Sequence, residues 1–427
     1  MTPPRLRSVS RLLQILRMKS DRTAILPAAL LPLALFVGCQ QDTSGMDPNA
    51  VKLGVLLPFT GSGAAAGTSL ERAMVLAVES INANGGVLER PFALNESDTR
   101  GDVNRTESLV GRLTSDPNLV ALIGPDEATL AVSTRATVVQ ATTTWLLPSA
   151  FGPDISSLYF PPRLFMLGPE VTSFTRAVYA RMQADGVLNP VILHDLDPND
   201  IRMANDLVTF AADDKRHYQA PVTLNPDSTT YADVASDVVT QPPDAIVLFA
   251  FPTIAATLIN EIAALGIHGG SKIRWYLGPP LQSEVLLQNV VPGILEGAIG
   301  VGAGCEANGA SFSDAYANRW EGDVPLLGAP YYYDATVLVA LALEARHSQS
   351  GGSLPSPDEL SQAIRTVASP PGTVVQWNQV ALALELVRQG EDIDYQGVCN
   401  SLDFDSMGVS QDAPVDYWRI ADNTIGN

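Results

Sequence analysis

The feature that most constrains the fold of this 427-residue chain is a regular alternation of strand and helix patterns that starts at residue 51. The first strand is predicted over 51–57, where the run VKLGVLL is rich in aliphatic residues. The next helix is predicted from apolar residues that recur at i, i+3, i+4 and i+7 between Leu70 and Ile81. Thr68 and Glu71 have the spacing of a capping box and are expected to begin that helix.

Strand and helix patterns then continue in two consecutive runs. Further strands are predicted at 92–95, 120–123, 145–147, 191–194, 222–224, 245–249, 273–277 and 298–301, and further helices at 103–114, 129–140, 204–211, 231–240 and 255–265. Such alternation forms parallel sheets with right-handed crossovers. The chain is also too long for one ordinary core. We therefore predict an α/β protein with two Rossmann-like lobes, each built on a parallel sheet.

The last part of the chain departs from this alternation. The section 312–388 is mainly helical, with Asp334 expected to cap a helix at 335–345, and a hairpin-like tail is predicted over 395–420. A helical section without a sheet of its own must pack on an existing lobe, so we expect several crossings between lobes and a multi-crossover hinge. The expected lobes are 51–168 plus about 300–390, and 169–299 plus about 391–427.

Residues 1–38 have the pattern of a secretion signal. Basic residues precede an apolar run at 24–37, and at 14 residues this run is shorter than the roughly 20 needed to span a bilayer. Either Met1 or Met18 is the true start. A buried N-terminal helix is the alternative interpretation.

The three cysteines are expected to have two different roles. Cys39 follows a small residue at the end of the apolar run, which resembles a bacterial lipobox, so Cys39 is expected to carry lipid and 39–50 to form a polar tether. Cys305 and Cys399 then remain as an even pair, which predicts a disulfide in an oxidising compartment. The alternatives are an incidental Cys39 and two free buried thiols.

Composition and motifs exclude several functions. The formal net charge of -20 disfavours nucleic acid and anionic membranes as partners. The sequence contains no common hydrolase, metalloprotease or phosphate-loop motif, and its four histidines have no metal-like spacing. We therefore expect a monomer that is not an enzyme and that holds neither a cofactor nor a metal.

A glycine-rich loop at 61–67 superficially matches a dinucleotide fingerprint. The segment 58–60 separates it from the strand, and the acids Glu96 and Asp98 come later than the ribose-binding acid of that fingerprint. Two interpretations are favoured over a nucleotide site. The loop either offers backbone N–H groups to a small solute or is a purely structural turn.

Six short segments lie in an order and at spacings typical of a known family. They are VKLGVLLPFTG at 51–61, ANGGV at 83–87, SDTRGD at 97–102, LIGP at 122–125, LPSA at 147–150 and the tail from YQGV at 395 to Gly408. Together they resemble the type I periplasmic binding proteins, in particular the leucine/isoleucine/valine-binding branch of ABC-importer receptors. The resemblance implies two lobes joined by three crossovers that close on a small solute.

The same resemblance implies partners and a location. It predicts a solute-binding lipoprotein that works with ABC permease and ATPase subunits, touches the membrane only through its lipid, and faces the periplasm or the cell exterior. A ligand-sensing lipoprotein without a dedicated transporter is the alternative, and an NAD(P)-dependent enzyme is a more distant one. The solute is expected to be an amino acid, an amide or a related compound.

In open α/β sheets ligands bind beyond the carboxyl ends of the strands. The residues expected to bind the solute lie in loops at such ends, with hydroxyl and N–H groups for an anionic or carbonyl end and phenylalanine rings as apolar walls. They are Phe59, Ser62, Glu127, Thr129, Ser149, Ala150, Phe151, Asn199, Phe251 and Pro280.

The amino-acid-binding pattern of the family is broken at several positions. Phe151 replaces a threonine, and Pro280 stands where an acid would hold an amino group. Glu127 or Asp126 is expected to pair with a cationic end in place of that acid, unless either is simply a solvated loop charge. Leucine is therefore expected to bind weakly or not at all.

Overall fold

The computed structural model describes residues 47–61, 63–149, 163–266, 273–305, 308–326, 328–350 and 353–426. Its first sheet is entirely parallel, with strand order β2-β1-β3-β4-β5. These strands are β1 (Val51–Leu57), β2 (Phe92–Asp98), β3 (Leu119–Ile123), β4 (Thr144–Leu147) and β5 (Leu164–Met166). The first four confirm the predicted strands, while β5 was not predicted.

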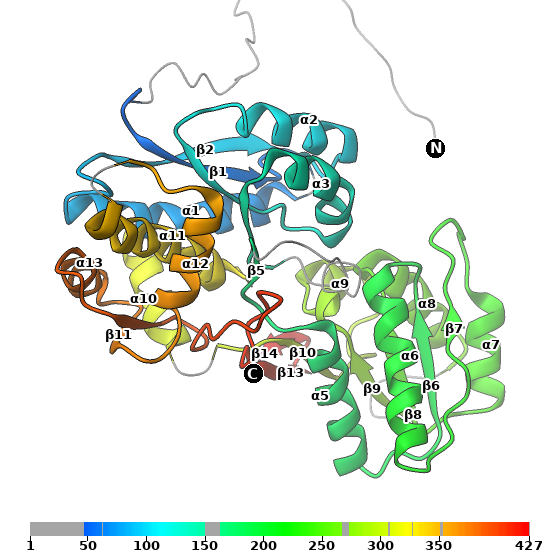
Figure 1. Cartoon of the computed structure of the whole chain (residues 1–427). Helices are drawn as coiled ribbons and strands as arrows, with labels where there is room; N and C mark the ends of the chain where they lie inside the picture. The colour runs from blue at the N-terminus through cyan, green and yellow to red at the C-terminus, as the bar shows by residue number, and fades with distance from the viewer. Residues whose placement is uncertain are drawn as a thin grey trace, which may run out of the picture. The chain divides into compact units, whose positions relative to one another are not determined.

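Helices cover both faces of this sheet (Figure 1). They are α1 (Ala64–Ala83), α2 (Val103–Leu113), α3 (Ala128–Ala141), α10 (Gly309–Arg319), α11 (Ala329–Ser350), α12 (Pro357–Val367) and α13 (Val380–Arg388). Successive side chains of a strand point to opposite faces. Leu53 and Val55 therefore pack in the core that contains α1 and α11, whereas Leu56 packs in the core that contains α2 and α3.

The second sheet has strand order β14-β13-β10-β9-β8-β6-β7. Its strands are β6 (Pro190–His194), β7 (Val222–Thr223), β8 (Ala245–Phe249), β9 (Arg274–Leu277), β10 (Ile299–Ala303), β13 (Val415–Ala421) and β14 (Thr424–Gly426). Its helices are α5 (Val171–Ala184), α6 (Pro198–Asp213), α7 (Ala232–Thr240), α8 (Pro252–Ala264) and α9 (Glu284–Asn289), with a 3-10 turn at Pro279–Leu281. The strands from β6 to β10 are parallel, and β13 and β14 are antiparallel additions.

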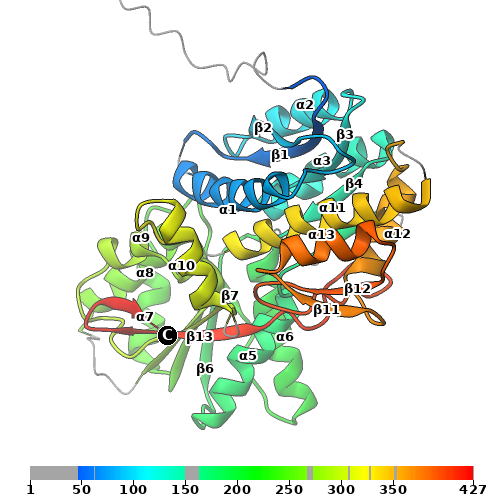
Figure 2. The same cartoon turned by 90° about the vertical axis from the view of Figure 1, so that its left-hand side faces the viewer.

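The helical section at 312–388 packs on the first sheet. This confirms the prediction that a section without a sheet of its own packs on an existing lobe. Helix α11 is buried along most of its length, and it runs beside α1 in both views (Figures 1 and 2). A helix that is apolar all round is typical of such a buried position. Asp334 lies inside this helix, so the prediction that it caps a helix is wrong. Its carboxylate instead accepts hydrogen bonds from the Tyr395 hydroxyl and the Val398 N–H, both at 2.8 Å.

Of two other local predictions, one is wrong and one holds in part. The first helix begins at Ala64 after Gly63, and the Thr68 hydroxyl donates to the Ala64 carbonyl within the helix, so no capping box forms. The tail has a hairpin-like turn at 405–408, where Phe404 and Ser410 form an antiparallel bridge, but its longer strands do not pair with each other. Instead, β12 (Ile393–Gln396) pairs in parallel with β11 (Thr373–Gln376), while β13 pairs with β10 of the second sheet.

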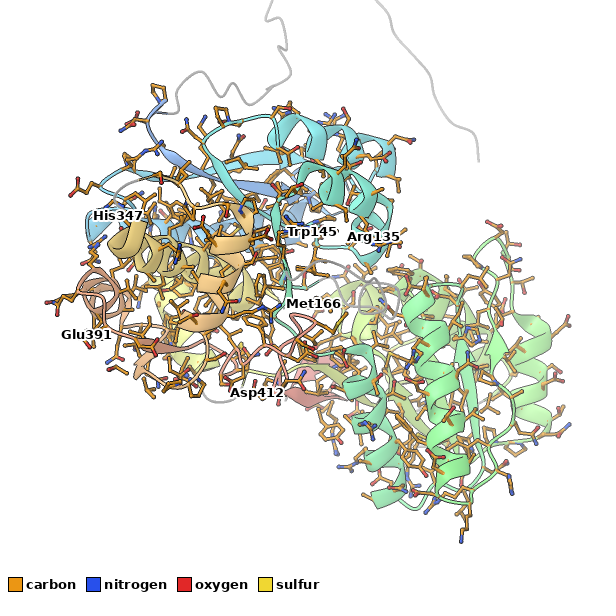
Figure 3. The ribbon with its side chains drawn as sticks, viewed as in Figure 1. Arg135, Trp145, Met166, His347, Glu391 and Asp412 are labelled. Atoms are coloured by element: carbon orange, nitrogen blue, oxygen red, sulfur yellow. A yellow bond between two sulfur atoms is a disulfide. The ribbon has the colours of Figure 1, made fainter. Side chains whose placement is uncertain are left out.

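The chain passes between the two sheets three times. It leaves the first sheet after β5, returns after β10, and leaves again between β12 and β13. The first and third passages touch: the Met166 N–H donates to the Gly408 carbonyl at 2.8 Å, and the Ser410 N–H donates to the Met166 carbonyl at 2.9 Å (Figure 3). The two lobes and their multiple crossovers are confirmed.

A disulfide joins the second and third passages. It links Cys305, just after β10, to Cys399, just after β12, with a Cα–Cα distance of 4.3 Å. This confirms the predicted pair and excludes the alternative of two free thiols. Strands β10 and β13 are neighbours in the second sheet, whereas Val398 is buried in the core of the first sheet. The exact lobe boundaries remain a prediction.

Candidate functional site

A cavity of about 210 Å³ lies at the carboxyl ends of strands from both sheets. Open α/β sheets bind ligands at such ends. The lining residues come from the loops after β3, β4, β6, β8 and β9 and from α3, α5 and α6. They are Asp126, Glu127, Ala128, Thr129, Ser149, Val171, Phe174, Asp197, Asn199, Asp200, Met203, Phe251, Pro279 and Pro280.

The loop after β3 is shaped by a close backbone approach. Gly124 has a φ of +84°, and a Cβ built on it would lie 2.4 Å from the Leu56 carbonyl oxygen, so only glycine fits there. The Trp145 ring N–H donates to the Gly124 carbonyl at 2.7 Å (Figure 3). This fixed turn presents Asp126 and Glu127 at the start of α3.

The loop after β6 is held by hydrogen bonds to carboxylates. Asp195 is buried and accepts from the Asp197 N–H at 2.8 Å and from the Phe251 N–H at 2.9 Å, which ties this loop to the start of α8. Asp197 caps α6 by accepting from the Asn199 N–H at 2.8 Å. The first turn of α6 thereby brings Asp200 to the cavity.

The structure brings together most of the residues predicted from the sequence. Glu127, Thr129, Ser149, Asn199, Phe251 and Pro280 all line the cavity, and so does Asp126. Phe59 is not among the lining residues; it packs against the core of the first sheet, and its N–H donates to Asp98. Ser62, Ala150 and Phe151 lie outside the described residues, as do Cys39 and the predicted signal at 1–38. That these side chains bind a ligand stays a prediction.

Sequence reasoning missed the apolar floor of the cavity. Val171 and Phe174 lie on α5, a helix that was not predicted. Met203 lies on α6, one turn beyond the predicted site residue Asn199. All three are buried. The apolar spacing Val171, Phe174, Val178 is a usable helical signal, but β5 before it has only three residues and gave no strand pattern.

The carboxyl groups of the cavity share a raised pKa. Burial raises the pKa of Asp126 to about 7 and that of Asp200 to about 9, with neighbouring acids adding to both effects. Burial also raises the pKa of Glu127 and Asp197, and the charge of Asp197 contributes to the shift of Glu127. A cluster of acids in such an environment is typical of a functional site, since perturbed pKa values gather at binding and catalytic sites.

The glycine-rich loop has a packing role. A Cβ on Gly67 would lie 2.1 Å from the Pro58 carbonyl oxygen, so glycine lets the first turn of α1 sit directly on the end of β1. Asp98, which comes too late in the sequence to be a ribose acid, accepts hydrogen bonds from the N–H groups of Phe59 and Thr60 and from the Thr60 hydroxyl. These contacts favour the structural interpretation of this loop.

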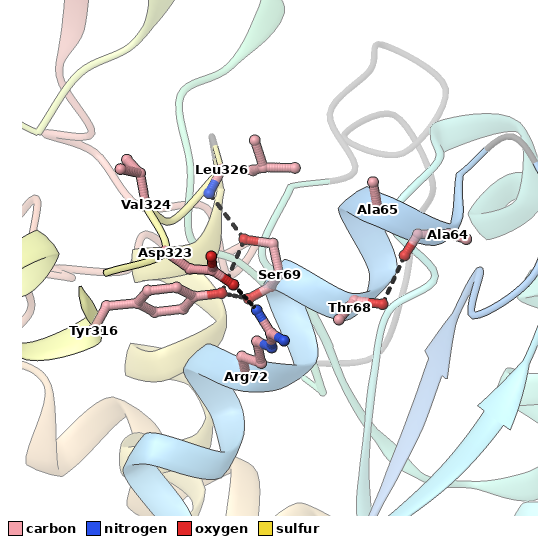
Figure 4. Close-up of a pocket in the computed structure, with 9 residues that line it drawn as sticks. All are labelled: Ala64, Ala65, Thr68, Ser69, Arg72, Tyr316, Asp323, Val324 and Leu326. Carbon is pink, nitrogen blue, oxygen red and sulfur yellow. Dashed lines mark hydrogen bonds and ion pairs between the residues drawn. The ribbon is translucent and has the colours of Figure 1, made fainter. Parts of the chain in front are cut away.

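A second depression, of about 420 Å³, lies beside the first half of α1 (Figure 4). Its polar side chains engage one another. Arg72 pairs with Asp323, the Ser69 hydroxyl accepts from the Leu326 N–H at 2.8 Å, and the Tyr316 hydroxyl donates to the Ser69 carbonyl at 3.3 Å. It therefore differs from the cavity between the sheets, where the charged lining residues are all acids.

Two features are absent from the described parts of the chain. Within them, no group of three or more histidine, cysteine, aspartate or glutamate side chains is placed to hold a metal ion. Among the same residues, none of the helices combines the length and apolar character needed to cross a bilayer.

Solved structures with this fold are numerous. The branched-chain amino acid substrate-binding protein LivJ from Streptococcus pneumoniae, solved with isoleucine, has a TM-score of 0.69 at 17% identity, covering 88% of this chain and 98% of that one. The leucine-binding protein LivK from Thermotoga maritima has a TM-score of 0.69 at 15% identity, covering 88% and 97%. An ABC-transporter solute-binding protein from R. palustris, solved with benzoate, has a TM-score of 0.61 at 17% identity, covering 82% and 96%.

The fold and the cavity between its two sheets define a protein of the type I periplasmic binding class. A family model described as periplasmic binding protein matches residues 50–379, and the chain belongs to this family. No curated protein sequence matches the chain. Family membership implies a location outside the cytoplasm, and the similar solved structures are of substrate-binding proteins.

Proposed function

We propose that this chain is the solute receptor of an ABC-type importer, which closes its two lobes on a small solute and delivers it to a permease. The observation that carries the proposal is the cavity at the carboxyl ends of both sheets, reached by loops from each lobe. The three passages of the chain between the sheets form a hinge. The proposed role is binding, in line with the solved substrate-binding proteins that share the fold.

We propose further that Cys39 carries lipid and that the receptor is held at the cell envelope by this anchor alone. The support is the short apolar run that ends at Gly38-Cys39. Phase separation in detergent tests it: the wild type should enter the detergent phase, and Cys39→Ala should stay in the aqueous phase. If both stay in the aqueous phase, the anchor proposal is wrong.

Uptake measurements test the receptor role. A thermal-shift screen of amino acids, amides, ureas, amines and aromatic acids identifies a solute that stabilises the protein. Cells that lack the chain should then lose high-affinity uptake of that solute, and the wild-type gene should restore it. Normal uptake of a tightly bound solute in cells without the chain would refute the importer role and favour a sensor.

A further inference from the structure

The ionisable side chains that line the cavity are all acids. Asp126 and Glu127 reach it from the first lobe, and Asp197 and Asp200 reach it from the second. No lysine, arginine or histidine is present among the described residues that line it. The carboxylate of a zwitterionic amino acid would meet no cationic partner among them and would be repelled by every acid that is ionised.

One oxygen of each of two of these carboxyl groups receives no N–H donor. The Asp200 side chain is 2% exposed, its Oδ2 accepts no N–H group, and its one side-chain hydrogen bond is shared with the Asp195 carboxylate. The Oδ1 of Asp126 is likewise buried without a partner. Asp195 provides the contrast, because N–H groups of Asp197 and Phe251 satisfy both of its oxygens. A buried acceptor left unsatisfied costs about 1 to 3 kcal/mol, so a bound ligand that donates N–H groups here recovers that free energy.

Acids from the two lobes also act on one another. Asp197 of the second lobe and Glu127 of the first line the same cavity, and the negative charge of Asp197 raises the pKa of Glu127. Without a ligand, this repulsion opposes any closer approach of the two loops. A cation between them replaces the repulsion by two attractions, so the same ligand that binds would also favour closure.

We propose that the solute is an organic cation with ammonium or amidinium groups, held between Asp126 and Glu127 of one lobe and Asp197 and Asp200 of the other. The inference rests on the proposed receptor function and deepens it. The cavity volume of about 210 Å³ lies below the range of about 300 to 1,000 Å³ that is usual for small-molecule sites, which suits a short solute. Phe174, Met203 and Phe251 supply an apolar wall for a methylene spacer between two charged ends.

A bound cation should lower the raised pKa values of Asp126 and Asp200, because it stabilises the charged form of each acid. Binding should therefore release protons and tighten as the pH rises from about 6 to about 9. The titratable groups that act on these acids or line the cavity with them are Glu127, Tyr332, Asp195 and Asp197, and none is basic. Calorimetry in two buffers of different ionisation enthalpy measures the proton release.

Calorimetry on the full chain, purified in detergent, tests the solute class with probes of equal length. These are 1,5-diaminopentane, pentylamine, 1,5-pentanediol and pentanoate. We expect the diamine to bind at least 100-fold more tightly than the diol, with pentylamine between them and no measurable binding of pentanoate. The diamine affinity should fall as salt rises, because salt screens exposed charge pairs.

Three variants locate the binding. Asp200→Asn and Glu127→Gln should each weaken diamine binding at least 10-fold; the Glu127 side chain makes no capping hydrogen bond to α3, so its variant should fold even if the first does not. Asp213→Asn, which removes the same charge at the far, exposed end of α6, should change affinity less than two-fold.

Equal affinity for diamine and diol, or tighter binding of leucine, pentanoate or Ca²⁺ than of the diamine, would overturn the cationic class and leave the receptor role standing. Loss of the receptor role is detected separately, by unchanged uptake in cells without the chain.

Discussion

Removing the disulfide is the sharpest test of how the chain crossings are held. The bond joins Cys305, at the return from the second sheet, to Cys399, in the core of the first. Replacing both by alanine leaves every strand pairing possible but releases a closed loop in the unfolded chain. The native contacts change little, so the effect should come mainly from the greater freedom of the unfolded state.

The magnitude follows from the loop length. A sequence separation of 94 residues gives about 4.6 kcal/mol in the chain-entropy estimate, and native-state strain usually makes the measured value smaller. The folded unit spans Met46–Asn427, for which unfolding in one transition has an entropy of about 0.8 kcal/mol/K. The melting temperature should therefore fall by up to about 6 °C.

Differential scanning calorimetry with and without a reductant measures this shift. The wild type should lose stability in the reductant, while the double variant should melt at the lower temperature in both conditions. A wild-type melting temperature that stays constant after both thiols have been shown to be alkylated would refute the reasoning.

Two further predictions concern the core. Arg388→Met should destabilise the protein by about 3 to 5 kcal/mol in urea unfolding, because Glu344, which is 3% exposed and 3.1 Å from Arg388, would lose its counter-ion. Adding Glu344→Gln should recover part of the lost stability, and no recovery would argue against a charge effect. Gly300→Ala should lower the free energy of unfolding by about 1 to 3 kcal/mol, because the new Cβ would lie 2.0 Å from the Trp418 ring. Gly111→Ala, which places its Cβ in open space on a helix, should be neutral or stabilising. Equal effects of the two substitutions would contradict the packing argument.

Local sequence patterns predicted the parts of the fold that depend on neighbours along the chain. The run at 51–57 is largely apolar because that strand is buried on both faces of its sheet, whereas the spacing from Leu70 to Ile81 follows the 3.6-residue period of a helix with one buried face. The pair Cys305 and Cys399 could be predicted by parity once Cys39 was assigned to the lipid anchor. Glu127, Thr129 and Ser149 were found because loops after parallel strands must meet at one edge of a sheet.

Only the tertiary structure decided which distant segments meet. The tail pattern at 395–420 is compatible with a hairpin, but its two strands belong to different sheets: β12 pairs with β11 and β13 pairs with β10, and neither partner could be read from the tail alone. Asp334 has the sequence context of a helix cap, yet it is buried in α11 because Tyr395 and Val398 donate to it. The acidity of the cavity is likewise a property of the two lobes together: Asp126 and Asp200 are far apart in the sequence, and only folding buries both beside one small space.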